Sequence, residues 1–390
     1  MTQVIAHDEW IRRAHLIGEK ALPEVAEAEK TGCFSLALRD FVHGLEMHKA
    51  LRPVQYGGSG VGAFTFSEIV RTVANYNASA AWLVYFVILH EQWVAYLDEE
   101  GRQEVYASDG LVGDIFMPLG QVEYVEGGVR LTGQWSFGSG VLWDEWMGLG
   151  AIVEVPGEDP QPCLVNVNKK DFKVIEDWNP FGLRGTGSHS VKVADVFVPW
   201  RHVLPVLKAK NKAEPVGGYY SDEPIFKAPF MAFFCLGFPA ISTGIAQRVA
   251  SDLKTRMEGR QRILYNMRES ESPIAQRNLA EVMVKLDALE AMNKKYVDQL
   301  EEWIAADTPL VEEAEKNKMG AWRSHISKEA SDLAFHAMNL LGASATGSGD
   351  PLETAARDAF MVYIHLGQIY EDNMMSYGRT QFGLSGHPLL

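Results

Sequence analysis

The chain has 390 residues, of which 47% are hydrophobic and 22% are charged, a balance typical of globular proteins. Its net charge of −15 argues against binding to nucleic acid or to anionic membrane surfaces, because both need basic patches. The three cysteines are widely spaced and include no CxxC pair, so the sequence indicates neither a disulfide framework nor a zinc site, and we expect no metal.

Residues 1–110 are expected to form an all-helical N-terminal domain. Apolar residues recur at helical spacing over residues 8–30, 34–44, 66–77 and 79–97. The first residues carry acids and no long apolar run, so they do not read as a signal peptide. No apolar run reaches the ~18 residues that a membrane helix needs. We therefore expect a cytoplasmic protein.

Two features of this region have more than one interpretation. Residues 58–63 match the GxGxxA dinucleotide fingerprint, but no strand precedes them and Pro53 stands where that strand would lie, so we interpret the match as accidental. His90 lies among aliphatic residues, where a lone histidine is usually a satisfied core residue and a functional role is the alternative. The sequence that follows His90 does not complete an HExxH zinc motif.

From about residue 111 the apolar period changes to two, which predicts a middle β domain over residues 111–205. Strands are expected at residues 122–125, 129–137, 146–153, 163–167, 172–174 and 191–198. Two loops rich in glycine and hydroxyl side chains, residues 133–140 and 178–188, interrupt this segment. Glycines let a backbone approach a ligand closely, although an ordinary glycine-rich turn is an equally good interpretation of either loop alone.

Several side chains of these loops are candidate ligand contacts, because hydroxyl, guanidinium and aromatic groups together suit a flat ligand with a polar edge. The first loop offers Trp135, Ser136, Phe137 and Ser139, and the second offers Arg184, Thr186 and Ser188.

Residues 206–390 are expected to form a C-terminal four-helix bundle after a linker at 206–229. Its helices are predicted at residues 232–262, 274–307, 310–341 and 352–373. The glycine-rich loop at 341–351 suits close approach to an anion or another subunit, and a plain linker is the alternative. Helices, then strands, then helices make the fold class α+β.

This order resembles that of the acyl-CoA dehydrogenase fold, and four motifs support the resemblance. They are the Pro-Val-Gln-Tyr-Gly-Gly turn at 53–58, the tryptophan loop at 133–140, the Gly-Leu-Arg-Gly-Thr-Gly-Ser loop at 182–188 and the Arg-Asp pair at 357–358. Dehydrogenases of this family commonly carry a catalytic glutamate in the last helix. The corresponding position here falls at about Leu366, and leucine is no base, while its neighbour is His365.

His365 and the strings Trp-Ser-Phe-Gly-Ser-Gly and Arg-Gly-Thr-Gly-Ser-His resemble the two-component, group D flavin monooxygenases of this superfamily. The resemblance implies FADH2 or FMNH2 as cofactor, O2 as co-substrate and a C4a-hydroperoxyflavin that oxygenates a small aromatic or heteroaromatic compound. It also implies a separate NAD(P)H:flavin reductase and a homotetramer. No βαβ unit for NAD(P)H is visible, which fits such a partner.

The same resemblance suggests roles for single residues. His365 is the expected catalytic acid or base, His90 matches an active-site histidine, and Ser139 matches a serine near the flavin N5 region. Arg260 and Arg262 are candidate phosphate contacts, although a solvated charged face explains either one as well. Two other hypotheses stay open, an acyl-CoA dehydrogenase with a non-standard base and a catalytically silent flavin-binding protein.

Overall fold

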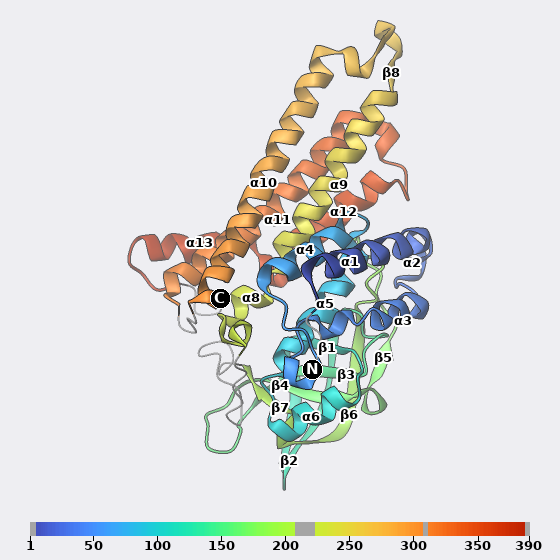
Figure 1. The fold of residues 1–390 in the computed structure, drawn as a ribbon. Coiled ribbons are helices and arrows are strands. Elements are labelled where there is room, and N and C mark those ends of the chain that lie inside the picture. Colours follow the sequence, from blue (N-terminus) through green and yellow to red (C-terminus); the bar gives the residue numbers. More distant parts are fainter. Residues whose placement is uncertain (1–4, 207–222, 307–310, 387–390) are drawn as a thin grey trace.

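The computed structural model describes residues 5–206, 223–306 and 311–386 (Figure 1). The N-terminal helices are α1 (His7–Ala21), α2 (Val25–Thr31), α3 (Leu36–Gly44), α4 (Ala63–Ala74), α5 (Ala78–Val94) and α6 (Glu99–Ala107). The single helix expected over residues 8–30 is wrong, because Pro23 lies in a 3-10 turn (Leu22–Glu24) that separates α1 from α2. Proline has no N–H for a helical hydrogen bond.

Two further details of this region bear on the predictions. Residues 58–63 lead into α4 from a 3-10 turn (Val54–Tyr56) and not from a strand, so the GxGxxA match belongs to no βαβ unit. Helix α6 was not expected from its polar sequence. The Asp98 side chain caps it by accepting a hydrogen bond from the Glu100 N–H.

The middle segment is a seven-stranded sheet in the order β5-β6-β2-β1-β3-β4-β7. Its strands are β1 (Val112–Val125), β2 (Gly128–Gly138), β3 (Trp146–Val153), β4 (Gln161–Asn168), β5 (Lys173–Ile175), β6 (His189–Pro199) and β7 (Val203–Pro205). Only β1 and β3 pair in parallel. Strand β1 begins at Val112, so the strand start predicted at residue 122 is wrong. The register of β1 shifts between Ile115 and Gly120, and this irregularity interrupts the alternating apolar pattern on which the prediction depended.

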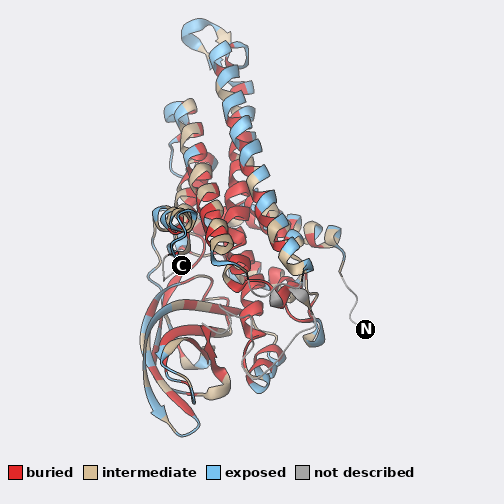
Figure 2. Cartoon of the chain, turned by 90° about the vertical axis from the view of Figure 1, so that its left-hand side faces the viewer, coloured by how far each residue is buried: buried red, intermediate tan, exposed pale blue. Residues whose placement is uncertain are grey.

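The C-terminal part is helical, as expected. It contains α8 (Phe230–Phe234), α9 (Gly237–Gly259), α10 (Pro273–Ala305), α11 (Glu313–Leu341), α12 (Pro351–Tyr363) and α13 (Tyr370–Gln381). Helices α9 to α12 form a bundle that rises from the sheet, and the hairpin of β8 (Gln261–Arg262) and β9 (Met267–Arg268) lies at its far end (Figure 1). Figure 2 shows buried residues along the inner faces of these helices and exposed ones outside.

One helical stretch, Phe230–Gly259, is long and apolar enough to cross a membrane, which the sequence reading did not anticipate. Of the window that passes this test, 89% is buried inside the fold. Helix α9 packs against α4, α10, α11 and α12, so its apolar surface is satisfied within the protein, as in the core helix of a soluble protein.

Helix α5 connects the three parts of the molecule. It packs against α4, α9, α12 and β1, and its own side chains are mostly apolar on every side of the helix. Such a helix is stable only when it is enclosed by protein. Every residue of α5 is buried except Phe86. The fold therefore leaves one accessible point along this central helix.

Candidate active site

Phe86, the accessible residue of α5, lies between Trp82 and His90. Trp82, Phe86 and His90 are spaced four residues apart and share one face of the helix. The Phe86 ring lies 5.2 Å from Trp82 and stacks on His90 with a centroid distance of 4.9 Å. Phe234 lies near His90 and adds to the apolar surroundings. This face of α5 forms one wall of a largely dry site.

His365 lies at the other end of the same face. Its ring centroid is 5.4 Å from that of Trp82 and 4.9 Å from that of Phe238. The continuous helix predicted over residues 352–373 is wrong, because α12 ends at Tyr363 and His365 begins a 3-10 turn (Leu366–Gln368) before α13. The glycine at 367 was the sequence signal for this break.

The break is fixed on both sides of Gly367. The Gly367 N–H donates to His365 Nδ1 over 3.1 Å, and the Gly367 carbonyl accepts from the Arg323 guanidinium over 3.0 Å. Arg323 is a buried residue of α11 that the sequence reading missed. It holds the turn and thereby the direction in which the His365 ring points.

These contacts determine the tautomer of His365. A backbone N–H can only donate, so Nδ1 is the acceptor and the proton of the neutral imidazole resides on Nε2. Burial lowers the pKa of His365 to about 4, and the positive charge of Arg323 acts in the same direction. Near neutral pH the ring is therefore neutral and presents an N–H donor at Nε2.

His90 has the opposite arrangement. Its Nδ1 lies 2.7 Å from the Val112 carbonyl oxygen, which can only accept, so the proton resides on Nδ1 and Nε2 is an acceptor. Burial lowers the pKa of His90 to about 4, although the hydrogen bond to Val112 opposes this shift. Asp114 Oδ2 lies 3.2 Å from Nε2. The structure thus brings together His90 and His365 on one wall, as an acceptor and a donor.

A chain of hydroxyl groups joins this wall to the β domain. The Trp82 indole N–H donates to Ser139 Oγ over 2.9 Å. Ser139 Oγ lies 2.9 Å from Ser188 Oγ, which lies 2.7 Å from Thr186 Oγ1. The Thr186 hydroxyl donates to the Leu183 carbonyl over 2.9 Å.

The last of these bonds sets the direction of all the others. The Thr186 hydroxyl donates its only proton to the Leu183 carbonyl, so the Ser188 hydroxyl must donate to Thr186. Because the proton of Ser188 is then used, Ser139 must donate to Ser188. The Ser139 oxygen already accepts from Trp82 and has one lone pair left. It is therefore placed to accept a hydrogen bond from a ligand N–H and not to donate one.

The other candidates of the tryptophan loop have different surroundings. Trp135 is buried in the sheet, and its indole N–H donates to the Gly150 carbonyl over 2.9 Å. Ser136 Oγ lies 3.1 Å from Ser190 Oγ. Phe137 has a φ of 71° and its side chain is 69% exposed. Its ring meets Trp178 edge-on at 6.0 Å. A left-handed backbone is strained for phenylalanine, which keeps Phe137 a candidate for a ligand contact.

Arg184 faces away from this hydroxyl chain. Its guanidinium donates to the Glu29 carbonyl of α2 over 2.9 Å, and it lines a cleft of about 720 Å³ together with Arg357 at α12. Arg260 and Arg262 lie beside the β8–β9 hairpin at the far end of the bundle, where their side chains bond to Leu341 and Ser272. Within this chain these three arginines are therefore separate from the wall formed by α5.

Asp114 was missed because the predicted first strand began after it. Its side chain is buried, and its Oδ2 has no hydrogen-bond partner that meets the usual geometry. Burial raises the pKa of this carboxyl well above its usual range, against a contact with Trp93 that lowers it. A lone acid within the apolar run that surrounds residue 114 was the available signal.

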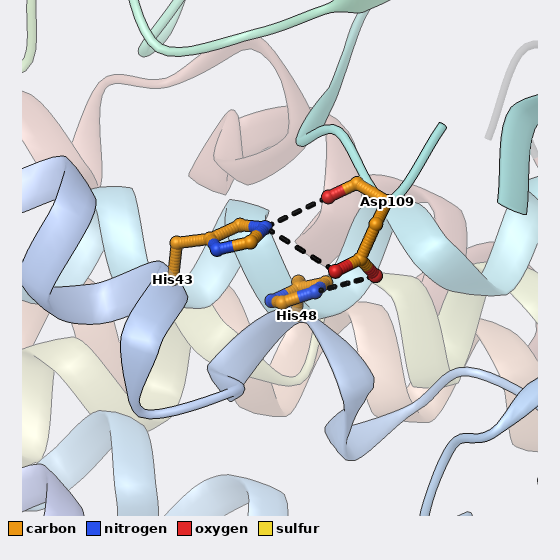
Figure 3. A group of neighbouring side chains, drawn as sticks. All are labelled: His43, His48 and Asp109. Carbon is orange, nitrogen blue, oxygen red and sulfur yellow. Dashed lines mark hydrogen bonds and ion pairs between the residues drawn. The ribbon is translucent and has the colours of Figure 1, made fainter. Parts of the chain in front are cut away.

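Among the described residues, one group could in principle hold a metal ion, formed by His43, His48 and Asp109 (Figure 3). The His48 Nε2 lies 3.2 Å from Asp109 Oδ1, and both histidines point at this carboxylate. Asp109 also pairs with Arg52 at 2.8 Å and with Lys49 at 3.7 Å. Two cations already compensate the carboxylate, which favours a structural role for the group.

Comparisons with known proteins agree with this fold. Residues 236–368 match the family model described as the C-terminal domain of acyl-CoA dehydrogenases. A pigment production hydroxylase of a Rhodococcus species is 28% identical over 321 residues, which are 81% of this chain and 81% of that protein. The p-hydroxyphenylacetate 3-hydroxylase, oxygenase component, of Acinetobacter baumannii is 25% identical over 357 residues, 88% of this chain and 82% of the relative.

The solved structure of XiaF from Streptomyces in complex with FADH2 and glycerol superposes with a TM-score of 0.90 at 22% identity. The match covers 97% of this chain and 96% of the other. These findings confirm the acyl-CoA dehydrogenase fold and the resemblance to its monooxygenase branch.

Proposed function

We propose that this protein, which has the acyl-CoA dehydrogenase fold and C-terminal domain, is the oxygenase component of a two-component flavin-dependent monooxygenase. It uses reduced flavin, FADH2 or FMNH2, together with O2 to oxygenate a small aromatic or heteroaromatic compound. A separate NAD(P)H:flavin reductase supplies the reduced flavin. Relatives that are named as hydroxylases and as oxygenase components support this activity.

The observation that carries the proposal is the direction of the hydroxyl chain at Ser139. Reduced flavin carries an N–H at N5, whereas oxidised flavin presents a lone pair there. Because Ser139 has an acceptor lone pair free and no proton to spare, its environment favours the reduced form. When bound, reduced flavin supplies the electrons that activate O2.

The protein contributes dryness, orientation and proton handling. Aromatic side chains along α5 keep water from the reacting groups. His365 presents an Nε2–H that can donate a hydrogen bond to a developing oxyanion, and His90 presents an acceptor. We propose that Ser139, Thr186, Ser188 and Phe137 lie against the flavin ring, and that Trp135, Ser136 and Arg184 support the two loops.

We infer a homotetramer in the cytoplasm. At the tip between β8 and β9, the apolar residues Ile263 and Leu264 are 89% and 94% exposed, and Arg260 and Arg262 lie beside them. Exposed apolar side chains at such a site support contact with another copy. In the assembly, Arg260 or Arg262 would reach the phosphate of a flavin bound in a neighbouring subunit. Light scattering of the wild type and of Leu264→Glu tests the assembly.

Rapid mixing of the reduced-flavin complex with O2 tests the function. We expect a transient oxygenated flavin by absorbance and, with substrate and reductase present, an oxygenated product. A dehydrogenase would instead purify yellow with tightly bound oxidised FAD. A silent flavin-binding protein would form no oxygen-dependent product with any compound. Absence of the transient with both FMN and FAD would overturn the proposal.

A further inference from the structure

His90 and Asp114 face each other as a buried pair. The Nε2 atom of His90 and the Oδ2 atom of Asp114 are 3.2 Å apart, and neither atom has a hydrogen-bond partner of good geometry. His90 is 2% exposed, and the Asp114 side chain is 7% exposed. Such an arrangement of buried polar atoms is costly unless a proton lies between them.

The hydrogen bond from His90 to the Val112 carbonyl fixes the tautomer of the ring, and the number of protons on the pair follows from that tautomer. It fixes one proton on Nδ1 of His90, so Nε2 is a lone-pair acceptor in the neutral ring. An ionised Asp114 would then place two acceptors against each other. One shared proton removes this conflict, either as a carboxylic acid that donates to Nε2 or as an imidazolium that donates to the carboxylate. Burial favours the first form, because it carries no charge.

The exposed part of Asp114 lies away from His90. Its Oδ2 has no accessible surface, so the remaining exposure of the side chain belongs to its other atoms, of which Oδ1 is the only polar one. The neighbouring ring of Phe86, stacked on His90, is the single accessible residue of α5. Asp114 and Phe86 both adjoin the His90 ring, and Oδ1 is the Asp114 oxygen that is left to accept a hydrogen bond from an aromatic molecule bound beside that ring.

We propose that Asp114 is a specificity-determining residue that selects aromatic substrates carrying an O–H or ring N–H group and relays their proton to His90. This inference rests on the proposed function. The substrate O–H or N–H bond breaks, its electron pair stays with the ring, and an O–H bond forms at Oδ1. The acid proton on Oδ2 passes to Nε2. The substrate has then lost one proton and His90 has gained one, and the net charge of the site is unchanged. The ring is thereby activated for electrophilic oxygenation.

The chain offers a matched control for Asp114. Asp144 is 3% exposed, its Oδ2 also has no hydrogen-bond partner, and burial raises its pKa well above the usual range. The nearby Asp114 acts in the same direction and Lys169 opposes it, so a change at Asp144 also tests the charge around Asp114. It makes no ion pair with His90 among those of the described residues. A change at Asp144 therefore reproduces the loss of a buried carboxyl without removing the partner of His90.

The experiment compares Asp114→Asn with Asp144→Asn, using phenol and indole against their methylated forms anisole and 1-methylindole. We expect the wild type to couple flavin oxidation to product with the donor compounds. In Asp114→Asn this coupling falls by about 100-fold, the size of a general-base contribution. The small coupling with the methylated forms stays, so the discrimination disappears, and Asp144→Asn keeps it. Equal behaviour of the two variants would overturn the inference.

Two further measurements separate the possible failures. Reaction of the reduced-flavin complex with O2 is followed without substrate in all three proteins, and we expect the same transient in each. If the wild type forms none, the proposed function fails first. If Asp114→Asn does not fold, infrared difference spectra of the wild type with phenol decide, since the relay requires the protonated-carboxyl band to change. An unchanged band overturns the inference with the function intact.

Discussion

The two histidines at the ends of the α5 face have similar rings and opposite chemical roles. His365 accepts a hydrogen bond from the backbone N–H of Gly367, and His90 donates one to the backbone carbonyl of Val112. Burial makes both rings neutral, with pKa values lowered to about 4. The atom that each ring presents is therefore set by a single main-chain group, an N–H in one case and a carbonyl in the other.

Their neighbours extend this difference. His365 has a fixed cation, Arg323, behind its turn, and this charge opposes any protonation of the ring. His90 has Asp114, a group that shares a proton with it. One end of the site is thus suited to donate a hydrogen bond and the other to accept a proton. Two neutral histidines can serve as hydrogen-bond donor and proton acceptor together only because their tautomers differ.

The largest expected effect comes from removing either ring. His90→Asn and His365→Asn should each lower product formation by about 100-fold or more, the usual contribution of a general acid or base. The two variants should differ in their pH dependence. The activity of His90→Asn, which lacks the acceptor, should recover as pH rises. The activity of His365→Asn, which lacks the donor, should recover as pH falls. Coupling assays from pH 6 to 9 check this, and parallel profiles would contradict the opposite roles.

A smaller effect is expected at the turn that fixes His365. Arg323→Met removes the donors to the Gly367 carbonyl, so the ring loses its orientation and product formation should fall by about tenfold. Gly367→Ala is the control, because an added Cβ would come no closer than 3.5 Å to its neighbours. The same assay with reduced flavin supplied measures both. Unchanged product formation by Arg323→Met would show that the turn after His365 keeps its conformation without Arg323.

The hydroxyl chain should change the preference for reduced over oxidised flavin by about the free energy of one neutral hydrogen bond. In Thr186→Val the chain loses its fixed end, so Ser139 can reverse and donate to oxidised flavin. The ratio of oxidised to reduced flavin dissociation constants should fall by about fivefold. Thr243→Val, which also removes a buried hydroxyl bonded to a carbonyl, should leave the ratio unchanged. Anaerobic and aerobic flavin titrations measure it.

The smallest effect concerns stability against acid. The pKa of His365, about 4, is below its ordinary 6.5, so its contribution is full above pH 6.5 and is lost as pH falls toward 4. The His90–Asp114 pair holds one proton when folded, and an unfolded chain also holds one in this range, on the histidine. This pair should therefore give no slope.

His365→Asn should consequently flatten the stability profile between pH 4 and 6.5 by about 1.4 kcal/mol per pH unit, and Asp114→Asn should steepen it by a similar amount. Denaturant unfolding at several pH values measures both slopes. Equal changes in the two variants would contradict the shared proton.

The order of the elements was readable from the sequence, because the change of apolar period at residue 111 and again after the linker is a local property. Errors occurred where local pattern and hydrogen bonding disagree. Pro23 and Gly367 each lie in a 3-10 turn that follows a helix, although the apolar spacing of that helix continues past them. The bend of β1 concealed its first half, and with it Asp114. Residues 207–222 of the expected linker lie outside the described residues.

The sequence by itself determined the fold and a set of candidate site residues, since these follow from residue type, spacing and motif. His90, Ser139 and His365 could all be named as candidates in this way. Only the tertiary structure decided which atom each one presents. A histidine tautomer and the direction of a hydroxyl depend on single main-chain groups, such as Val112, Leu183 and Gly367, that the fold brings beside them. No periodicity in the chain encodes those contacts.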